Sequence, residues 1–380
     1  MSGATLSGAR HLYVHLPFCS SRCGYCDFVT AVGRRGDHER YVRALLGELE
    51  LERAVLAPDL ETVYLGGGTP TFTGPGALAT LLAALPPSAE LSVEANPETV
   101  TPALAGLLHD AGVDRVSLGA QSFQPPLLAV LGRVAQPDDV RRAVHTLRGA
   151  GFDNVSLDLI YGIPGQEPAD LERDLAEALA LEPDHLSAYE LEAKPGTRFT
   201  HRHGAALRRQ AEAMESYFEL VVERLIGAGY RWYETASFAR IPELAGGRDL
   251  RARHNLGYWL GHDYLGLGVG AVSTIEGRRW RNAPSLARYL GALARGNVPP
   301  REVEELPPGV RAAERVLLGL RLDEPLALAE VGGALDHDEL ERLERAGLVA
   351  SNGGGLSLTR RGRFVGGGVT ARLLAPTMSG

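Results

Sequence analysis

Cysteine is scarce in this chain of 380 residues, which has three cysteines, Cys19, Cys23 and Cys26, in one short segment. An odd number of closely spaced cysteines does not fit a disulfide framework, because such frameworks pair an even number across a small domain. Long apolar runs are also missing, since no stretch approaches the roughly 18 apolar residues of a membrane-spanning helix. The first residues lack the apolar core of a secretion signal. The sequence therefore predicts a cytoplasmic protein without a transmembrane segment.

An excess of positive charge is absent as well, because the formal net charge is −8. Surfaces that bind nucleic acid need clustered Lys and Arg, so this balance argues against nucleic acid as a partner. Hydrophobic residues at 44% and charged residues at 23% are ordinary for a globular protein. Since a domain commonly has roughly 150 residues, the length predicts two domains, or one large domain with an appendage.

Short apolar segments alternate with amphipathic ones along the first half of the chain. The segments with strand character are 11–16, 62–66, 91–95, 115–120, 154–162 and 185–191. The segments with helical spacing of apolar residues are 37–54, 74–84, 100–111, 136–149 and 168–181. This alternation predicts parallel βαβ units, and hence an α/β fold with an open doubly wound sheet or a full or partial (β/α) barrel. In each case the active site forms at the carboxyl ends of the strands.

The last third of the chain has a different pattern. One long helix is expected at 205–228, and the segment 295–310, rich in proline and charge, is the best linker. The residues after it predict helices and a small hairpin, "LVASNGGGLSLT", which is typical of a winged-helix-like α+β domain. We therefore expect domains at 1–295 and 296–380. The balanced charge of the second favours a lid or a partner surface over DNA binding.

The cysteines have the spacing C-x3-C-x2-C directly after the first predicted strand. Thiolates bind soft metals, and close spacing lets one loop wrap one metal centre. A structural zinc site needs four ligands, and no second Cys or His pair completes one, although His11, His15 or Asp27 could be recruited. A [4Fe–4S] cluster held by three cysteines leaves one iron open for a substrate or cofactor. The sequence therefore favours a cluster over zinc, and zinc over three unliganded cysteines.

This spacing, with an aromatic residue before the last cysteine, resembles the signature of the radical S-adenosylmethionine (SAM) superfamily. The resemblance implies a partial (β/α) TIM-like barrel, a [4Fe–4S] cluster on Cys19, Cys23 and Cys26, and S-adenosylmethionine chelated to the fourth iron. In that superfamily an electron from the cluster cleaves the sulfonium and gives a 5′-deoxyadenosyl radical. The cofactors carry the chemistry and the protein positions them.

Further motifs follow the next predicted strands. Three glycines in "YLGGGTPT" let backbone approach a ligand closely, whereas a tight turn alone would need one. Glu94 ends the third strand, where an acidic residue suits ribose hydroxyls. Asp158 lies in an apolar strand, where a charge needs a partner. Arg133 and Asp158 either pair with each other or contact the carboxylate and ribose of a ligand, and a plain surface role is the alternative for each of them.

The order of these motifs is similar to that in one branch of the superfamily, which contains the oxygen-independent coproporphyrinogen III dehydrogenases and the heme chaperone HemW. The segments "YVHLPFC", "GGGTPT", "SLGAQSF", "DLIYGIPGQ" and "RHNLGYW" all match, and the resemblance runs from about residue 11 to residue 365. It implies that a set of residues lines the S-adenosylmethionine site, namely Tyr13, Tyr25, Gly68, Thr69, Glu94, Gln121, Arg133 and Asp158.

Two departures favour the chaperone over the dehydrogenase. The dehydrogenase resembles C-x3-C-x2-C-x-C, but this chain continues with Asp27 and Phe28 after the third cysteine. Its first predicted strand also begins at residue 11, without the longer N-terminal segment of the dehydrogenase. The resemblance therefore implies a chaperone that binds heme and passes it to membrane-associated respiratory hemoproteins. The alternatives are oxidative decarboxylation of coproporphyrinogen III, and radical chemistry on another tetrapyrrole.

The segment "RHNLGYW" supplies His254, Tyr258 and Trp259. A neutral imidazole is a good axial ligand for heme iron, and Tyr and Trp rings offer flat apolar faces to a porphyrin. Our hypothesis is that His254 helps to hold heme. The alternative is a packed structural turn that carries a hydrogen-bonded histidine.

Overall fold

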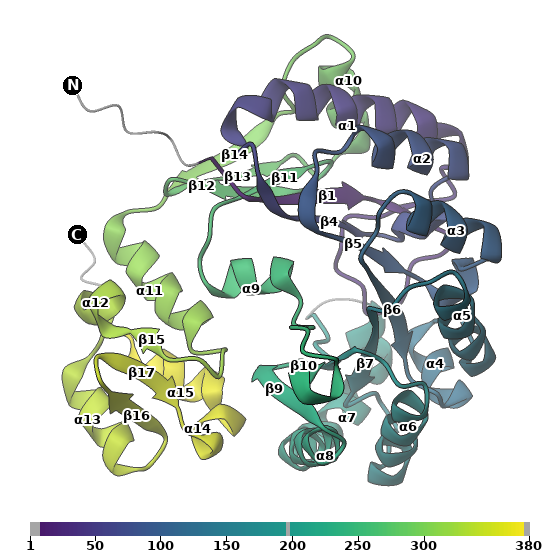
Figure 1. Ribbon diagram of the computed structural model, residues 1–380. Helices are drawn as coiled ribbons and strands as arrows, with labels where there is room; N and C mark the ends of the chain where they lie inside the picture. Colours follow the sequence, from purple (N-terminus) through teal and green to yellow (C-terminus); the bar gives the residue numbers. More distant parts are fainter. Residues whose placement is uncertain (1–7, 195–197, 376–380) are drawn as a thin grey trace, which may run out of the picture.

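The computed structural model describes residues 8–194 and 198–375 (Figure 1). Six strands lie next to one another in parallel: β1 (His11–Leu16), β4 (Leu60–Gly67), β5 (Ser88–Ala95), β6 (Arg115–Gln121), β7 (Val155–Tyr161) and β8 (His185–Glu190). The helices between them include α1 (His38–Glu52), α2 (Pro75–Ala84), α3 (Pro102–Asp110), α5 (Pro137–Gly149) and α6 (Pro168–Ala180). The predicted alternation of strands and helices is confirmed.

The parallel strands form the middle of a larger open sheet. Next to β1 come β11 (Tyr264–Leu267), which is parallel to it, and then the antiparallel strands β12 (Val272–Ile275), β13 (Arg278–Asn282) and β14 (Arg301–Glu305). Next to β8 come the antiparallel strands β10 (Ser237–Arg240) and β9 (Tyr230–Glu234). Since the strand order of the described residues starts at β14 and ends at β9, the α/β fold is a partial barrel, as expected.

Alternation along β1 decides which side chains enter the main core. Leu12, Val14 and Leu16 are fully buried and share one core with Tyr41 and Leu45 of α1. Successive side chains of a strand point to opposite faces, so the residues between these leucines and valine point into the barrel interior. The helices therefore cover the outer face of the sheet, and the inner face is left for polar and aromatic side chains.

A buried carboxylate ties α1 to the antiparallel extension of the sheet. Glu48 Oε2 accepts hydrogen bonds from the Tyr289 hydroxyl at 2.6 Å and from the Gly268 backbone N–H at 2.8 Å. Glu48 Oε1 accepts one from Asn282 Nδ2 at 2.6 Å. Burial raises the pKa of Glu48 to about 7, although these hydrogen bonds oppose the increase. One side chain thus satisfies donors from three distant segments.

The last segment forms a smaller unit with a hydrophobic core of its own, which includes Val316, Leu343 and Leu356. Its elements are α11 (Pro308–Gly319), β15 (Leu326–Ala327), α12 (Leu328–Val331), α13 (His337–Arg345), β16 (Val349–Asn352), β17 (Gly355–Leu358), α14 (Arg360–Phe364) and α15 (Gly366–Leu373). Helices and a hairpin in this order match the winged-helix-like part of the expected fold. The boundary after residue 295 stays a prediction, and β14, which follows it, pairs with β13 in the large sheet.

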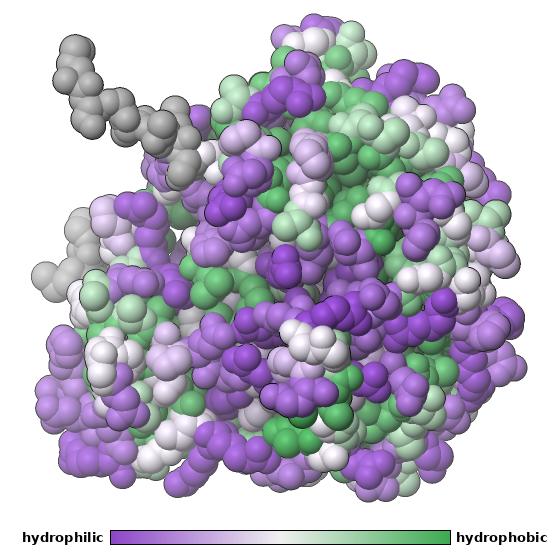
Figure 2. All heavy atoms as spheres, in the orientation of Figure 1, coloured by the Kyte–Doolittle hydropathy of each residue, from purple (hydrophilic) through white to green (hydrophobic). Residues whose placement is uncertain are grey.

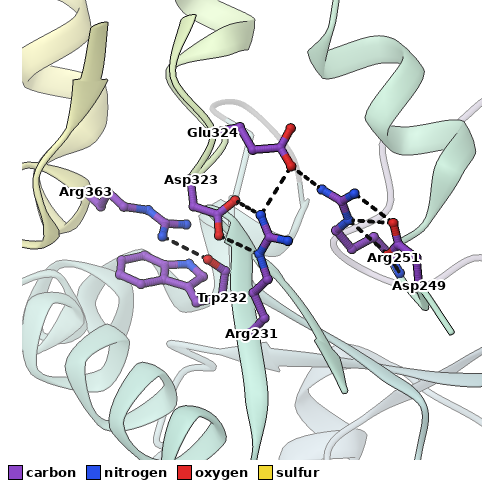
Figure 3. A network of polar contacts seen from close by, with 7 residues as sticks. All are labelled: Arg231, Trp232, Asp249, Arg251, Asp323, Glu324 and Arg363. Carbon is purple, nitrogen blue, oxygen red and sulfur yellow. Dashed lines mark hydrogen bonds and ion pairs between the residues drawn. The ribbon is translucent and has the colours of Figure 1, made fainter. Parts of the chain in front are cut away.

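Charged side chains join this smaller unit to the barrel. Figure 3 draws the contacts among Arg231, Trp232, Asp249, Arg251, Asp323, Glu324 and Arg363. Arg231 of β9 donates two hydrogen bonds to Asp323, at 2.8 and 2.9 Å. Arg363 of α14 donates one to the Trp232 carbonyl at 2.8 Å, and its guanidinium carbon stands 3.6 Å from the centroid of the Trp232 ring. These contacts fix α14 against the end of the sheet.

One helix differs from the prediction. The single helix expected at 205–228 is two helices, α7 (Arg198–Ala211) and α8 (Met214–Gly227). No Gly or Pro marks the break. Gln210 beside it donates a hydrogen bond to the Gln166 carbonyl at 3.0 Å, so tertiary contacts accompany the turn of the chain there.

Hydrophilic and hydrophobic side chains are interspersed over the face of the molecule seen in Figure 2. None of the helices in residues 8–194 and 198–375 combines the length and apolar character that crossing a membrane requires.

Candidate functional site

The carboxyl ends of the parallel strands border one large cavity of about 1170 Å³. All but two of the predicted site residues line it, namely Cys19, Cys23, Tyr25, Cys26, Gly68, Thr69, Glu94, Gln121, Arg133 and Asp158. The two that do not are Tyr13 and His254. The topology explains the convergence, because the ends of neighbouring parallel strands meet at one rim of the barrel.

The cysteine loop follows β1, and its three cysteines line this cavity. Cys19 is buried, and its sulfur accepts a hydrogen bond from the Thr69 hydroxyl at 3.6 Å. The Gly24 backbone N–H donates to the Leu131 carbonyl at 3.1 Å, which docks the loop on the end of α4 (Pro125–Leu131). Burial raises the pKa of the Cys19 and Cys26 thiols. All three thiols are free, so a soft metal centre would find three donors on one loop.

The three glycines of "GGGT" are required by close protein neighbours. A Cβ on Gly67, whose φ is +112°, would lie 2.5 Å from the His15 ring, and one on Gly68 would lie 2.6 Å from the Pro17 carbonyl. Gly67 and Gly68 also line the cavity. Packing against the start of the cysteine loop therefore accounts for part of this motif, in addition to the approach to a ligand.

Glu94 stands at the end of β5 with both carboxylate oxygens engaged. Oε1 accepts a hydrogen bond from the Tyr64 hydroxyl at 2.9 Å, and Oε2 accepts one from the Gly67 backbone N–H at 3.0 Å. Burial raises the pKa of Glu94 to about 7, and the charge of Asp158 adds to the increase. A carboxylate oxygen has room for a second donor, so hydroxyl groups of a ligand can still bond to Glu94.

Arg133 reaches across the cavity wall towards the cysteines. Its Nη2 donates to the Gly119 carbonyl at 2.6 Å and to Asn96 Oδ1 at 3.1 Å, and its Nη1 stands 3.8 Å from the Cys23 sulfur. Its Nε is buried and has no hydrogen-bond partner among the described residues. An unused donor beside the cysteine loop suits an anionic group of a ligand.

Asp158 is held by the hydroxyl of Ser117, which donates to its Oδ2 at 3.0 Å. Burial raises the pKa of Asp158, while hydrogen bonds from Ser187 and Ser117 lower it. Of the two alternatives for Arg133 and Asp158, direct pairing is not the one that the structure shows, since Arg133 bonds to Asn96 and Gly119, and contact of both with a ligand stays a prediction. Both groups still line the cavity.

Gln121 has a left-handed backbone with φ +68°, which is uncommon for a residue with a side chain. The pairing of β6 with β7 shifts register between Gly119 and Gln121, so an extra residue is accommodated at the cavity rim. Such bulges re-aim side chains. Gln121 faces the cavity together with Tyr25, which packs against a small cluster that includes Leu127 and Leu131.

Tyr13 is not among the residues that line the main cavity, and its contact with S-adenosylmethionine stays a prediction. Tyr13 lines a smaller hollow of about 230 Å³, which shares Asp27 and Phe28 with the main cavity. Its hydroxyl is 3.0 Å from His15 Nδ1, and its ring stacks on Tyr64 with centroids 6.3 Å apart. A Cβ on Gly66 would lie 3.0 Å from the Tyr13 ring and 3.1 Å from the Glu94 carboxyl carbon, so Tyr13 packs close to a residue of the main cavity.

His254 is likewise not available to a ligand in the main cavity. It is 1% exposed, its Nδ1 is 2.7 Å from the Thr62 hydroxyl, and its Nε2 is 3.0 Å from the Tyr258 hydroxyl. Both ring nitrogens are therefore occupied, and the structure supports the alternative of a packed, hydrogen-bonded histidine. As an axial heme ligand, His254 would have to leave both partners.

The helix that carries "RHNLGYW" explains why His254 does not face the main cavity. In α9 (Arg253–Trp259), residues four apart share a face, so His254 and Tyr258 point one way and Asn255 and Trp259 another. Asn255 and Trp259 line the main cavity. If this segment had been predicted as a helix, the sequence would have placed His254 and Tyr258 on one face and Asn255 and Trp259 on another.

The far part of the cavity comes from the C-terminal unit and was not predicted. Its apolar lining includes Leu317, Leu318, Leu320, Leu358, Phe364 and Val365. Arg321 and Arg363 also line it, and the guanidinium of Arg321 stands 4.4 Å from the Trp259 ring centroid. Trp259 Nε1 and Arg363 Nη2 are buried donors without a partner among the described residues. An apolar space with unused donors in its wall suits a flat ligand with carboxylates.

Two residues that organise the site were missed by the sequence analysis. Asn96 donates to Thr69 Oγ1 at 3.2 Å and accepts from Arg133, and so it connects the glycine loop to the arginine. Tyr64 orients Glu94. Asn96 stands two residues after Glu94, at the same strand end, and that position was a usable signal.

Comparisons with known proteins agree with this arrangement. The model of the Radical SAM superfamily matches residues 13–178, and that of the HemN C-terminal domain matches residues 306–365. The heme chaperone HemW of Mycobacterium tuberculosis is 40% identical over 96% of this chain and 94% of its own length. That of Bacillus subtilis is 33% identical over 95% and 98%. The structure of coproporphyrinogen III oxidase (HemN) from Escherichia coli, a radical SAM enzyme, superposes with a TM-score of 0.80 at 24% identity, over 97% of this chain and 91% of that one.

Proposed function

Because the chain belongs to the radical SAM superfamily and to its heme chaperone HemW family, we propose that it binds heme, a [4Fe–4S] cluster and S-adenosylmethionine, and hands heme to other hemoproteins. The observation that carries this proposal is one cavity with two chemically different parts. Three free thiols lie at one end, and an apolar space with Trp259, Arg321 and Arg363 lies at the other.

The near part of the cavity fits the two cofactors that the superfamily uses. Cys19, Cys23 and Cys26 would hold the cluster through their thiolates, with one iron left open. Arg133, with its unused Nε, and Glu94 would hold the charged and hydroxyl groups of S-adenosylmethionine. When bound, this pair supplies one-electron reduction of a sulfonium. The protein's own part is to orient the ligands.

The far part fits heme by its chemistry. Trp259 and Phe364 offer aromatic surface to a porphyrin, and Arg363 offers a donor to a propionate. Burial lowers the pKa of Arg363 to about 10, so the guanidinium is still charged at neutral pH and would gain from an anionic partner. This placement sets heme apart from His254.

Coproporphyrinogen III oxidation is the alternative function, because the fold is shared with an oxidase of that substrate. Phe28 stands where the dehydrogenases have a fourth cysteine, and this favours the chaperone. We further propose that recipients are membrane-associated respiratory hemoproteins and that the protein acts in the cytoplasm.

The proposed function is tested with anaerobically reconstituted protein. Titration with heme is expected to reach about one heme per chain, and incubation with coproporphyrinogen III, S-adenosylmethionine and a reductant is expected to give no protoporphyrinogen. Turnover of coproporphyrinogen without tight heme binding would overturn the chaperone assignment and support the alternative.

Two variants separate the positions considered for heme. Trp259→Ala is expected to weaken heme binding about tenfold, since an aromatic contact contributes on the order of 1 kcal/mol beyond its buried area. His254→Ala is expected to leave heme affinity unchanged, provided that circular dichroism shows a native fold. Heme absorption spectra check both. Loss of binding in His254→Ala alone would restore the axial-ligand hypothesis.

The pKa of Glu94 predicts that S-adenosylmethionine binding depends on pH. The ionised carboxylate is the better acceptor for ribose hydroxyls, so affinity rises as pH passes upward through about 7. Between pH 6 and pH 8 the ionised fraction of such a group rises roughly tenfold, and affinity should follow. Equilibrium binding to the cluster-loaded protein measures this. The same rise in Glu94→Gln would show that another group is responsible.

A further inference from the structure

Three potential metal ligands meet at the end of the barrel opposite the cysteine loop. His11 is the first residue of β1, Glu61 is the second of β4, and His262 comes two residues before β11. Since β4, β1 and β11 are adjacent and parallel, with His11 paired to Thr62 and to Tyr264, the topology brings the three side chains together. Their ligand atoms all lie within 4.8 Å of one another.

The distances suit one small cation. His11 Nε2 is 3.1 Å from His262 Nδ1 and 3.8 Å from Glu61 Oε2. Two nitrogens bound to one tetrahedral zinc ion at about 2.0–2.1 Å lie roughly 3.3 Å apart, so small side-chain adjustments would admit the ion. Two imidazoles and one carboxylate are a known ligand set for zinc, with water in the fourth position.

The surroundings orient these side chains. Arg10 Nη1 holds Glu61 Oε1 at 2.8 Å, which leaves Oε2 directed at His11. His11 Nδ1 is 2.9 Å from the Thr62 hydroxyl. Metal-binding histidines commonly have their second ring nitrogen held in this way, because the hydrogen bond fixes tautomer and orientation.

The motif helix α9 takes part in this support. Thr62 Oγ1 also bonds to His254 Nδ1 at 2.7 Å, and His254 in turn to Tyr258 at 3.0 Å. A side chain on Gly257 would collide with the His11 ring, with a Cβ 2.8 Å from Nε2. His254 and Gly257 thus keep His11 in place, so these two buried residues of "RHNLGYW" orient a proposed metal ligand.

We propose that His11, Glu61 and His262 form a binding site for a divalent first-row cation, of which Zn²⁺ suits the ligand set best. His11 is buried, whereas Glu61 is partly exposed and His262 is exposed, so an ion can enter from solvent and keep a water ligand. The ion would cross-link β1 and β4 to the turn after α9, which is 251 positions away from His11 in the chain. Its role at this end of a barrel is structural.

The test uses the full chain with its cysteines occupied by the iron–sulfur cluster, so that thiolates do not compete for zinc. Zn²⁺ is titrated against a chromophoric chelator under anaerobic conditions. One zinc ion per chain is expected for the native protein, and Zn²⁺ should raise its thermal unfolding midpoint. His262→Ala and Glu61→Gln are expected to weaken zinc binding at least about tenfold, since even indirect disturbances of metal ligands cost this much.

The matched control is His145→Ala, which removes an exposed histidine from α5 and should leave zinc affinity unchanged. Because His262 and Glu61 are not in the core, both test variants should fold, and circular dichroism checks this. Equal zinc affinity of the native protein and His262→Ala would overturn the proposal, as would the absence of zinc binding at micromolar concentrations. Zinc retained by His262→Ala but lost on replacing the cysteines would locate the ion at the other end of the barrel.

Discussion

A chain in which Cys19, Cys23 and Cys26 are all replaced by serine is expected to hold no iron–sulfur cluster after anaerobic reconstitution. These are the only thiols in the chain, and a serine hydroxyl does not replace a thiolate as a ligand for iron in such clusters. S-adenosylmethionine binding should fall with the cluster, because the open iron is its proposed anchor. Iron and sulfide content and visible absorption measure the loss.

The fold of this variant should survive. Cys23 and Cys26 are partly exposed, and the Thr69 hydroxyl that donates to Cys19 can donate to a serine oxygen as well. Phe28→Ala, a change to an exposed residue of the same loop, is the matched control and should retain a full cluster. Iron bound at the native level by the serine variant, or zinc in place of iron in the native protein, would contradict the assignment of the loop.

The second large effect is expected on stability. Glu48→Ala removes the acceptor of the Gly268 N–H, the Asn282 amide and the Tyr289 hydroxyl in a buried environment. Since each unsatisfied buried group costs about 1–3 kcal/mol, we expect the free energy of unfolding to fall by about 3 kcal/mol or more. Denaturant unfolding followed by circular dichroism measures this. Glu50→Ala, at an exposed position of the same helix, should change it by no more than about 0.5 kcal/mol.

Glu48 also predicts how stability depends on pH. Its pKa is raised from 4.5 to about 7 in the folded protein, so between these values the folded chain keeps a proton that the unfolded chain has lost. The contribution of this group is therefore fully present below pH 4.5 and is lost as pH rises to about 7. Glu48→Gln should remove this pH-dependent part of the free energy of unfolding.

A loss of stability below 0.5 kcal/mol in Glu48→Ala would contradict the prediction for that variant, and it would show that the cluster around Glu48 rearranges freely.

The barrel and most of the near part of the cavity were predictable, because their signals are local. Strand character, glycine runs and polar residues at strand ends are written in short segments, and parallel strands must end at one rim. Glu94 and Arg133 follow from that rule together with the family resemblance. Their actual partners, Tyr64 and Asn96, depend on side-chain directions that strand positions alone do not give.

The features that the sequence did not reveal share a cause. Tyr13 and His254 were placed by motif membership, whereas strand alternation in β1 and the face of α9 decide where their side chains point. The break between α7 and α8 is accompanied by tertiary contacts such as the hydrogen bond from Gln210 to the Gln166 carbonyl. No local sequence pattern predicts such contacts. In the far part of the cavity, residues near 320 and 360 lie beside residues of the barrel. Contacts between residues so far apart in the chain produce no periodic pattern in the sequence.

Because residues of the barrel and of the C-terminal unit line the same cavity, a ligand bound there would hold these two parts of the protein together. A ligand that touches Trp259 on one side and Phe364 on the other must be released before the C-terminal helices can come away from the barrel. At a hundredfold excess over Kd, such a ligand adds about 2.7 kcal/mol to the work of that separation. If the proposed function holds, proteolysis of the C-terminal unit should therefore be slower with heme bound than without it, and the rate of cleavage would report the release of heme.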